Sequence, residues 1–100
     1  MSWEAILKAV KYLKANQTRR VIEYMGQQNN RPMSALQIQD AVGREFRQFP
    51  TVIRLDMILK KDAESPDGDF EISYDDNMRK PNGDLIRLYS VLGDRDWETV

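Results

Sequence analysis

Apolar residues recur at three- and four-residue steps from Ser34 to Lys61, which is the period of an amphipathic α-helix. The period is interrupted between Phe46 and Pro50, so the pattern predicts two helices joined by a short connection. The expected inner positions of the first helix are Ala35, Ile38, Ala41, Val42 and Phe46. The expected inner stripe of the second helix is Val52, Leu55, Ile58 and Leu59.

Local signals predict where these two helices begin and end. Ser34 is a good N-cap, because its hydroxyl can accept a hydrogen bond from a backbone N–H one turn on. Pro50 suits the first position of the second helix, where its missing N–H is not needed. Phe49 precedes a proline and is disfavoured in α geometry, so the first helix should end by that point.

Two further helices are expected before this pair. One runs from Asn16 to Gln28, with Asn16 or Thr18 as its cap and a polar run after Gly26 that weakens its end. Its expected buried residues are Val21, Ile22, Tyr24 and Met25. The other runs from Ser2 to Ala15 and has a single apolar stripe, formed by Trp3, Ile6, Leu7, Val10 and Leu13.

The stripe of the N-terminal helix has two interpretations. It can pack into the core of its own domain. It can also form a homodimer interface, because two-fold dimers are the commonest oligomers. In the second case Trp3, Leu7 and Val10 are the candidate dimer contacts.

The pattern after Lys61 changes from helical to alternating. The acidic and turn-forming residues at 62–69 predict a solvated acidic loop with a turn at Ser65–Gly68. Phe70–Tyr74 and Asp84–Leu92 alternate as strands do. Between them, Pro81-Asn82-Gly83-Asp84 predicts a hairpin turn in which the Asn-Gly pair takes positive φ.

Composition limits the chemistry that is available to the chain. One hundred residues with 41% hydrophobic content are enough for one modest core. The chain contains neither cysteine nor histidine. This excludes disulfides, Cys/His zinc sites, thiol nucleophiles and imidazole acid–base catalysis. We expect no signal peptide or transmembrane helix, because Glu4 and three lysines interrupt the first apolar residues, and we therefore expect a cytoplasmic (intracellular) protein.

The net charge of −1 conceals an uneven distribution along the chain. Residues 1–61 contain 11 Lys/Arg and 5 Asp/Glu, a balance of +6, whereas residues 62–100 contain 4 and 11, a balance of −7. The two central helices lie in the basic half, which favours an anionic partner. The alternative is a dipolar domain whose two halves pack side by side.

The outer side of the second central helix carries the most informative residues, Ile53, Arg54, Met57 and Lys61, with Asp56 and Lys60 at its flanks. Arg54 could reach guanine edges, and Thr51 with Ile53 could touch phosphate and a thymine methyl. The apolar pair Ile53 and Met57 is also compatible with docking to a protein, because methionine adapts to varied partner surfaces.

No catalytic constellation is recognised in the sequence. The carboxylate pairs, Asp67 with Asp69 and Asp75 with Asp76, fall in loops that are expected to be exposed. The chain has no P-loop and no nucleophile motif. We therefore expect a protein that is not an enzyme and that has no cofactor or metal site.

Three stretches carry a resemblance to the winged helix-turn-helix superfamily, namely MSALQIQDAVG, TVIRLDMILKK and PNGDLIRLYSVL. The order of elements over Gln17–Leu92 is similar to that family: a helix, a tiny strand at Arg31-Pro32-Met33, two helices and a two-stranded wing. The resemblance implies an α+β, mostly α fold, a winged helix-turn-helix with an additional N-terminal helix. The expected organisation is an N-terminal helix over residues 1–16, the winged-helix domain over 17–92 and an acidic tail over 93–100.

The resemblance also implies a function. The second central helix would enter the major groove of double-stranded DNA and the wing would contact the backbone. When the family's DNA-contacting positions are carried over to this sequence, the resemblance implies that the DNA-binding residues are Thr51, Arg54, Lys61, Arg79 and Lys80. The resulting hypothesis is a small intracellular DNA-binding transcriptional regulator that acts as a homodimer. The alternative is a winged-helix adaptor that binds another protein in a transcription or replication complex through Ile53 and Met57.

Overall fold

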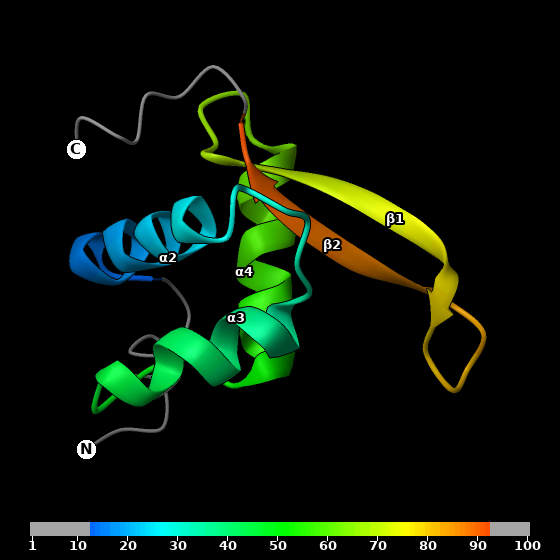
Figure 1. Cartoon of the computed structure of the whole chain (residues 1–100), viewed down its shortest axis with the longest axis horizontal. Coiled ribbons are helices and arrows are strands. Elements are labelled where there is room, and N and C mark those ends of the chain that lie inside the picture. The colour runs from blue at the N-terminus through cyan, green and yellow to red at the C-terminus, as the bar shows by residue number, and fades with distance from the viewer. Residues whose placement is uncertain (1–12, 93–100) are drawn as a thin grey trace.

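The computed structural model describes residues 13–92, in which three helices lie beside a two-stranded antiparallel sheet (Figure 1). The elements are α2 (Ala15–Gln27), α3 (Ala35–Val42), the 3₁₀ turn η1 (Gly43–Glu45), α4 (Val52–Glu64), β1 (Phe70–Arg79) and β2 (Leu85–Val91). The far half of the β1–β2 hairpin extends away from the helices (Figure 1). The α+β class expected from the sequence is confirmed at this level.

The start of α2 differs from the prediction. Lys14 is the N-cap residue, and the Gln17 side chain accepts a hydrogen bond from the Lys14 backbone N–H at 3.0 Å. Leu13 and Lys14 are not helical, so the helix predicted over residues 2–15 does not continue to Ala15. The remainder of that predicted helix lies outside the described residues.

The start of α3 was predicted correctly, and its end was not. Ser34 Oγ accepts a hydrogen bond from the Gln37 N–H at 3.3 Å, and Gln37 Oε1 accepts one from the Ser34 N–H at 2.9 Å, which together form a capping box. The helix ends at Val42 because Gly43, a poor helix former, begins the η1 turn. Phe46 then lies in extended backbone and stacks on Phe49, with ring centroids 5.8 Å apart.

The helix α4 begins at Val52, two residues later than Pro50 predicts. Thr51 is its N-cap, and Thr51 Oγ1 accepts a hydrogen bond from the Arg54 N–H at 3.4 Å. A hydroxyl provides the acceptor that proline lacks, which explains why the cap falls at Thr51.

The connection from α4 to β1 is tighter than the predicted solvated loop. Asp62 belongs to α4, and its Oδ2 accepts hydrogen bonds from the N–H groups of Asp69 at 2.9 Å and Phe70 at 3.0 Å. The predicted turn is present, because the Gly68 N–H donates to the Ser65 carbonyl at 3.1 Å. Gly68 passes so close to α4 that a Cβ there would lie 1.9 Å from the Asp62 carbonyl oxygen. This approach requires glycine.

The hairpin is longer than the sequence pattern indicates. β1 continues beyond Tyr74 to Arg79, and the register shifts between the Tyr74–Arg87 and Arg79–Leu85 pairs. Between these two pairs β1 advances by five residues and β2 by two, which is a bulge in β1. Because the bulge breaks the alternation of side chains, the sequence pattern does not reveal that the strand continues. At the turn only Gly83 has positive φ (+93°), so the prediction that Asn82 shares it is wrong.

Two contacts attach the α2–α3 connection to β2. Met33 forms a single antiparallel bridge with Tyr89, at the position where the resemblance implies a tiny strand. Just before it, the Asn30 side chain donates to the Val91 carbonyl and accepts from the Val91 N–H, both at 2.8 Å. Asn30 has a φ of 54°, a left-handed conformation that asparagine tolerates better than most residues.

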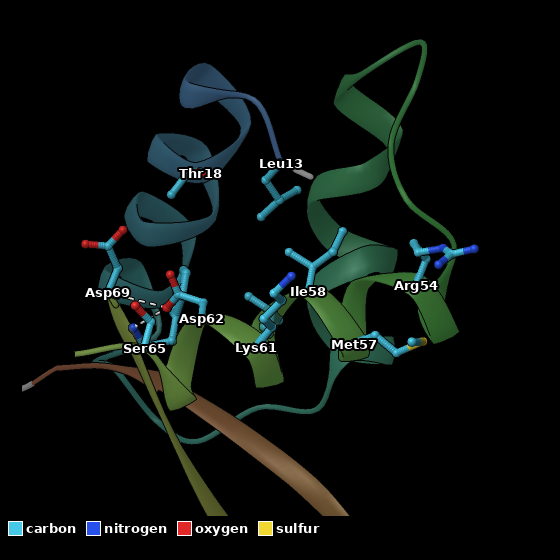
Figure 2. A pocket seen from close by; sticks show the side chains of 11 residues that line it. Leu13, Thr18, Arg54, Met57, Ile58, Lys61, Asp62, Ser65 and Asp69 are labelled. Carbon is cyan, nitrogen blue, oxygen red and sulfur yellow. Dashed lines mark hydrogen bonds between the residues drawn. The ribbon is translucent and has the colours of Figure 1, made fainter. Parts of the chain in front are cut away.

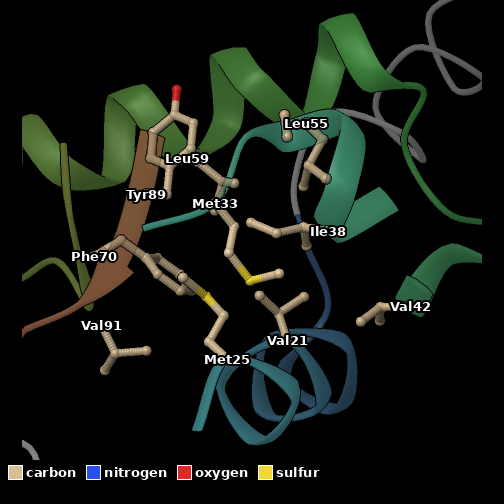
Figure 3. Close-up of a cluster of buried hydrophobic side chains, with 11 residues drawn as sticks. Val21, Met25, Met33, Ile38, Val42, Leu55, Leu59, Phe70, Tyr89 and Val91 are labelled. Atoms are coloured by element: carbon tan, nitrogen blue, oxygen red, sulfur yellow. The ribbon is translucent and has the colours of Figure 1, made fainter. Parts of the chain in front are cut away.

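The core lies where the three helices meet the near end of the sheet (Figure 3). Leu55 and Leu59 of α4 pack there with Ile38 and Val42 of α3, all fully buried. Ile22, Tyr24 and Ile58 were expected inside and are only half-buried. The buried cluster is Val21, Met25, Met33, Ala35, Ile38, Val42, Leu55, Leu59, Phe70, Tyr89 and Val91.

Candidate functional site

The solvent side of α4 carries the residues singled out from the sequence. Ile53 is 77% exposed and Met57 is 53% exposed, while Leu55 and Leu59 on the opposite side are fully buried. Arg54 is half-buried in this surface. The predicted division of the helix into an inner and an outer side is therefore confirmed for these positions.

Asp56 does not share the outer surface, contrary to its predicted flanking position. It faces β2, where Arg87 Nε donates to Asp56 Oδ1 at 3.3 Å and Arg87 Nη2 donates to Oδ2. The Tyr89 hydroxyl donates to the same Oδ1 at 2.6 Å. The helix thus presents its one carboxylate between Val52 and Lys61 to the sheet.

These contacts shift the ionisation of the three side chains. Burial alone would raise the pKa of Asp56, but the hydrogen bonds from Arg87 and Tyr89 outweigh it, and the pKa is lowered. The Asp56 hydrogen bond raises the pKa of Arg87. Burial, followed by the Asp56 contact, raises the pKa of Tyr89. Asp56 is consequently a carboxylate and Tyr89 a neutral phenol across the physiological range.

A groove of about 450 Å³ lies between the start of α2 and the outer side of α4 (Figure 2). It brings together Arg54, Met57 and Lys61 of the predicted site, and adds Ile58 from the half-buried edge of α4. Leu13 and Thr18 line it from the α2 side. The predicted site residues Thr51 and Ile53 do not line it, although both are exposed at the N-terminal end of α4. We call this feature the α2–α4 groove.

The predicted wing residues lie on the hairpin, and the charge of Lys80 contributes to the lowered pKa of Asp56 on α4. Arg79 and Lys80 are exposed at the hairpin turn, which is the end of the hairpin distant from the helices (Figure 1). Arg79 Nη1 donates to the Gly83 carbonyl at 2.9 Å, so its guanidinium is held across the turn. The structure therefore separates the predicted DNA-binding residues into an α4 group and a hairpin group.

Several positioning residues were missed by sequence reasoning. Gln17 is buried on α2, and its Nε2 donates to the Gln48 carbonyl at 2.6 Å, which fixes the α3–α4 connection. Arg20 of α2 donates to Glu45 of η1 at 2.7 Å, and this hydrogen bond raises its pKa. Asn30 was interpreted only as part of a weak helix end. The consecutive asparagines, Asn29 and Asn30, were the available sequence signal for an ordered helix C-terminus, because asparagine tolerates the positive φ that both residues adopt.

Comparison with known proteins gives no relative for this chain. No family model, no curated protein and no solved structure matches it. Within residues 13–92, no group of three acidic side chains could hold a metal ion. In the same part of the chain, no helix has the length and apolar character needed to cross a membrane. The candidate dimer residues Trp3, Leu7 and Val10 lie outside the described residues.

Proposed function

We propose that residues 13–92 form a winged helix that binds double-stranded DNA as a transcriptional regulator, with α4 as the recognition helix and the β1–β2 hairpin as the wing. The observation that carries the proposal is the placement of Asp56. Its carboxylate pairs with Arg87 on the sheet side, which removes the one acidic group between Val52 and Lys61 from the outer side of α4. A phosphate backbone approaching Arg54 then meets no carboxylate from the neighbouring turns, and Asp62 beyond Lys61 accepts the N–H groups of Asp69 and Phe70.

The order and contacts of the elements support the winged-helix assignment. The α3 and α4 helices pack on each other through Ile38, Val42, Leu55 and Leu59. The Met33 bridge to Tyr89 lies where the family resemblance implies a short strand between α2 and α3. The Arg87–Asp56 pair then holds the middle of the hairpin against α4.

The separation of the two basic groups supports an extended polyanion as the ligand. Arg54 lies on α4, whereas Arg79 and Lys80 lie at the distant turn of the hairpin (Figure 1). An anion with several charges along its length can contact cations on both elements. Duplex DNA offers phosphates along its whole length and a major groove wide enough for a helix.

The test is fluorescence anisotropy with a labelled random-sequence DNA duplex at two salt concentrations. We expect a Kd tighter than about 100 μM at physiological salt and weaker binding at the higher salt, since cations on the protein displace counterions from phosphate. The matched control is Lys60→Ala, because Lys60 is exposed and pairs at 3.6 Å with Glu64 on its own helix. Absence of binding by the full chain at low salt would contradict the proposal.

A second candidate function is docking to another protein. The specific observation is the exposure of two apolar side chains, Ile53 and Met57, about one turn apart on α4. Large apolar side chains that are open to solvent in this way are typical of the centre of a protein interface. In that case Ile53 would fill an apolar pocket of the partner and Arg54 would lie at the rim.

A further inference from the structure

The α2–α4 groove is apolar at its base and polar at its edge. Leu13, Met57 and Ile58 supply apolar lining (Figure 2). Leu59 and Phe70 also line the groove and are buried. The polar residues that line it are Thr18, Arg54, Lys61, Asp62, Ser65 and Asp69. A groove with this composition fits an amphipathic helix that has a narrow apolar stripe.

The segment before Leu13 has such a stripe. Trp3, Ile6, Leu7 and Val10 recur at three- and four-residue steps, and Lys8 and Lys11 fall off the stripe. Leu13 continues the same spacing, and in the structure it is half-buried, packs against the core and lines the groove. The last member of the stripe is therefore already in place at the groove.

The segment is short enough to fit within the groove. The eight residues 3–10 in helical form span about 12 Å at 1.5 Å per residue. The α4 residues along the groove run from Arg54 to Lys61, and Ser65 follows at the C-cap. From Arg54 to Ser65 is eleven residues, so the groove extends about 16 Å along α4 at the same rise per residue.

The backbone at Lys14 permits the necessary change of direction. Lys14 has φ −73° and ψ 161°, an extended conformation, so the chain before it need not continue the axis of α2. A segment that is attached at the groove also has a high effective concentration there, which favours the chain's own segment over a second copy. Removing each large apolar side chain from water favours the docked state.

We propose that residues 3–10 dock as a short helix in the α2–α4 groove of their own chain, with the apolar stripe against Met57 and Ile58 and with Lys8 toward solvent. The docked segment covers Met57 and leaves Ile53 as the exposed apolar residue of α4. It also lies beside Arg54, so it forms one margin of the surface that we propose for DNA.

The first test uses the absence of natural cysteine in the chain. In the full-length protein, Val10→Cys with Ile58→Cys introduces two thiols, which a short bis-maleimide can join. We expect an intramolecular cross-link, detected by mass spectrometry of the monomer. The matched control is Val10→Cys with Ile53→Cys, because Ile53 is on α4 but outside the groove lining, and this pair should give no such product. A predominantly intermolecular product would assign the groove to a second copy and overturn the proposal, as would equal cross-linking of both pairs.

The second test needs no thiols and keeps the proposal falsifiable if the cysteine variants do not fold. Leu7→Ala, Ile58→Ala and the double variant are compared by urea unfolding. We expect each single change to lower the unfolding midpoint and the double change to lower it by less than the sum, because the two residues share one contact. If the double variant lowers the unfolding midpoint by the full sum of the two single changes, docking is contradicted. Neither test depends on DNA binding, so failure of one proposal is distinguishable from failure of the other.

Discussion

Arg87 on β2 and Asp56 on α4 form a two-point ion pair, with Nε to Oδ1 at 3.3 Å and Nη2 to Oδ2. The two residues are 31 positions apart in the chain, and both side chains are more than three-quarters buried. Because Tyr89 donates to the same carboxylate, the middle of the hairpin is attached to α4 through three side chains. The orientation of the hairpin relative to α4 therefore depends on this cluster.

Arg87→Ala should destabilise the fold by about 1.5–3 kcal/mol, the range for hydrogen bonds to charged groups. The change removes two donors and leaves Asp56 partly buried with only Tyr89 as its side-chain donor. The measurement is the free energy of unfolding from urea denaturation followed by circular dichroism. Lys60→Ala is the control, because exposed i,i+4 pairs such as Lys60–Glu64 contribute only about 0.3–0.5 kcal/mol. Equal effects of the two variants would contradict the structural role of Arg87.

Acid should remove the contribution of Asp56 to stability. The folded pKa of Asp56 is lowered, so its stabilising effect is fully present above the unfolded value of about 3.9 and is lost as pH falls through the folded pKa. Asp56→Asn should therefore be less stable than the natural protein at neutral pH, and the difference should shrink as pH falls below about 4. Unfolding free energies measured across this pH range test the prediction. A difference that stays constant with pH would contradict it.

A matched pair of substitutions on α4 should separate the two candidate functions. Arg54→Ala should weaken DNA binding, by about 1–3 kcal/mol if the guanidinium pairs bidentately with guanine, whereas Ile53→Ala should leave it nearly unchanged. Both variants are measured by anisotropy with the same duplex, after a thermal melt confirms folding. If Ile53→Ala instead abolishes binding to a purified protein partner and Arg54→Ala does not, docking is the function of this surface.

The hairpin turn should contribute affinity that is independent of DNA sequence. Changing Arg79 and Lys80 together to alanine should reduce the slope of log K against log salt by about 2, at roughly 0.9 per phosphate contact. Arg31→Ala is the control, because Arg31 is exposed in the α2–α3 connection, outside the proposed DNA surface. An unchanged slope would mean that the hairpin turn does not touch the backbone. A smaller effect of Arg79→Ala than of Lys80→Ala would reflect the hydrogen bond that already holds Arg79 to Gly83.

The sequence by itself determined the features that depend on neighbours within a few positions. The N-cap at Ser34, the turn at Ser65–Gly68 and the buried Leu55–Leu59 side of α4 follow from local hydrogen bonding and helical periodicity. The order of helices followed by a strand pair was also evident, because the apolar period changes once along the chain.

Only the tertiary structure decided which polar side chains meet across the fold. Periodicity places Asp56 at the edge of a helix, but it does not reveal that Arg87 lies opposite, because that contact depends on how the hairpin packs. The same holds for Asp62, which the acidic composition of its surroundings assigned to a solvated loop, and which instead accepts the N–H groups of Asp69 and Phe70. Hydrophobic periodicity records which side of each element avoids water, whereas the pairing of charged groups depends on the relative placement of elements, which no local pattern contains.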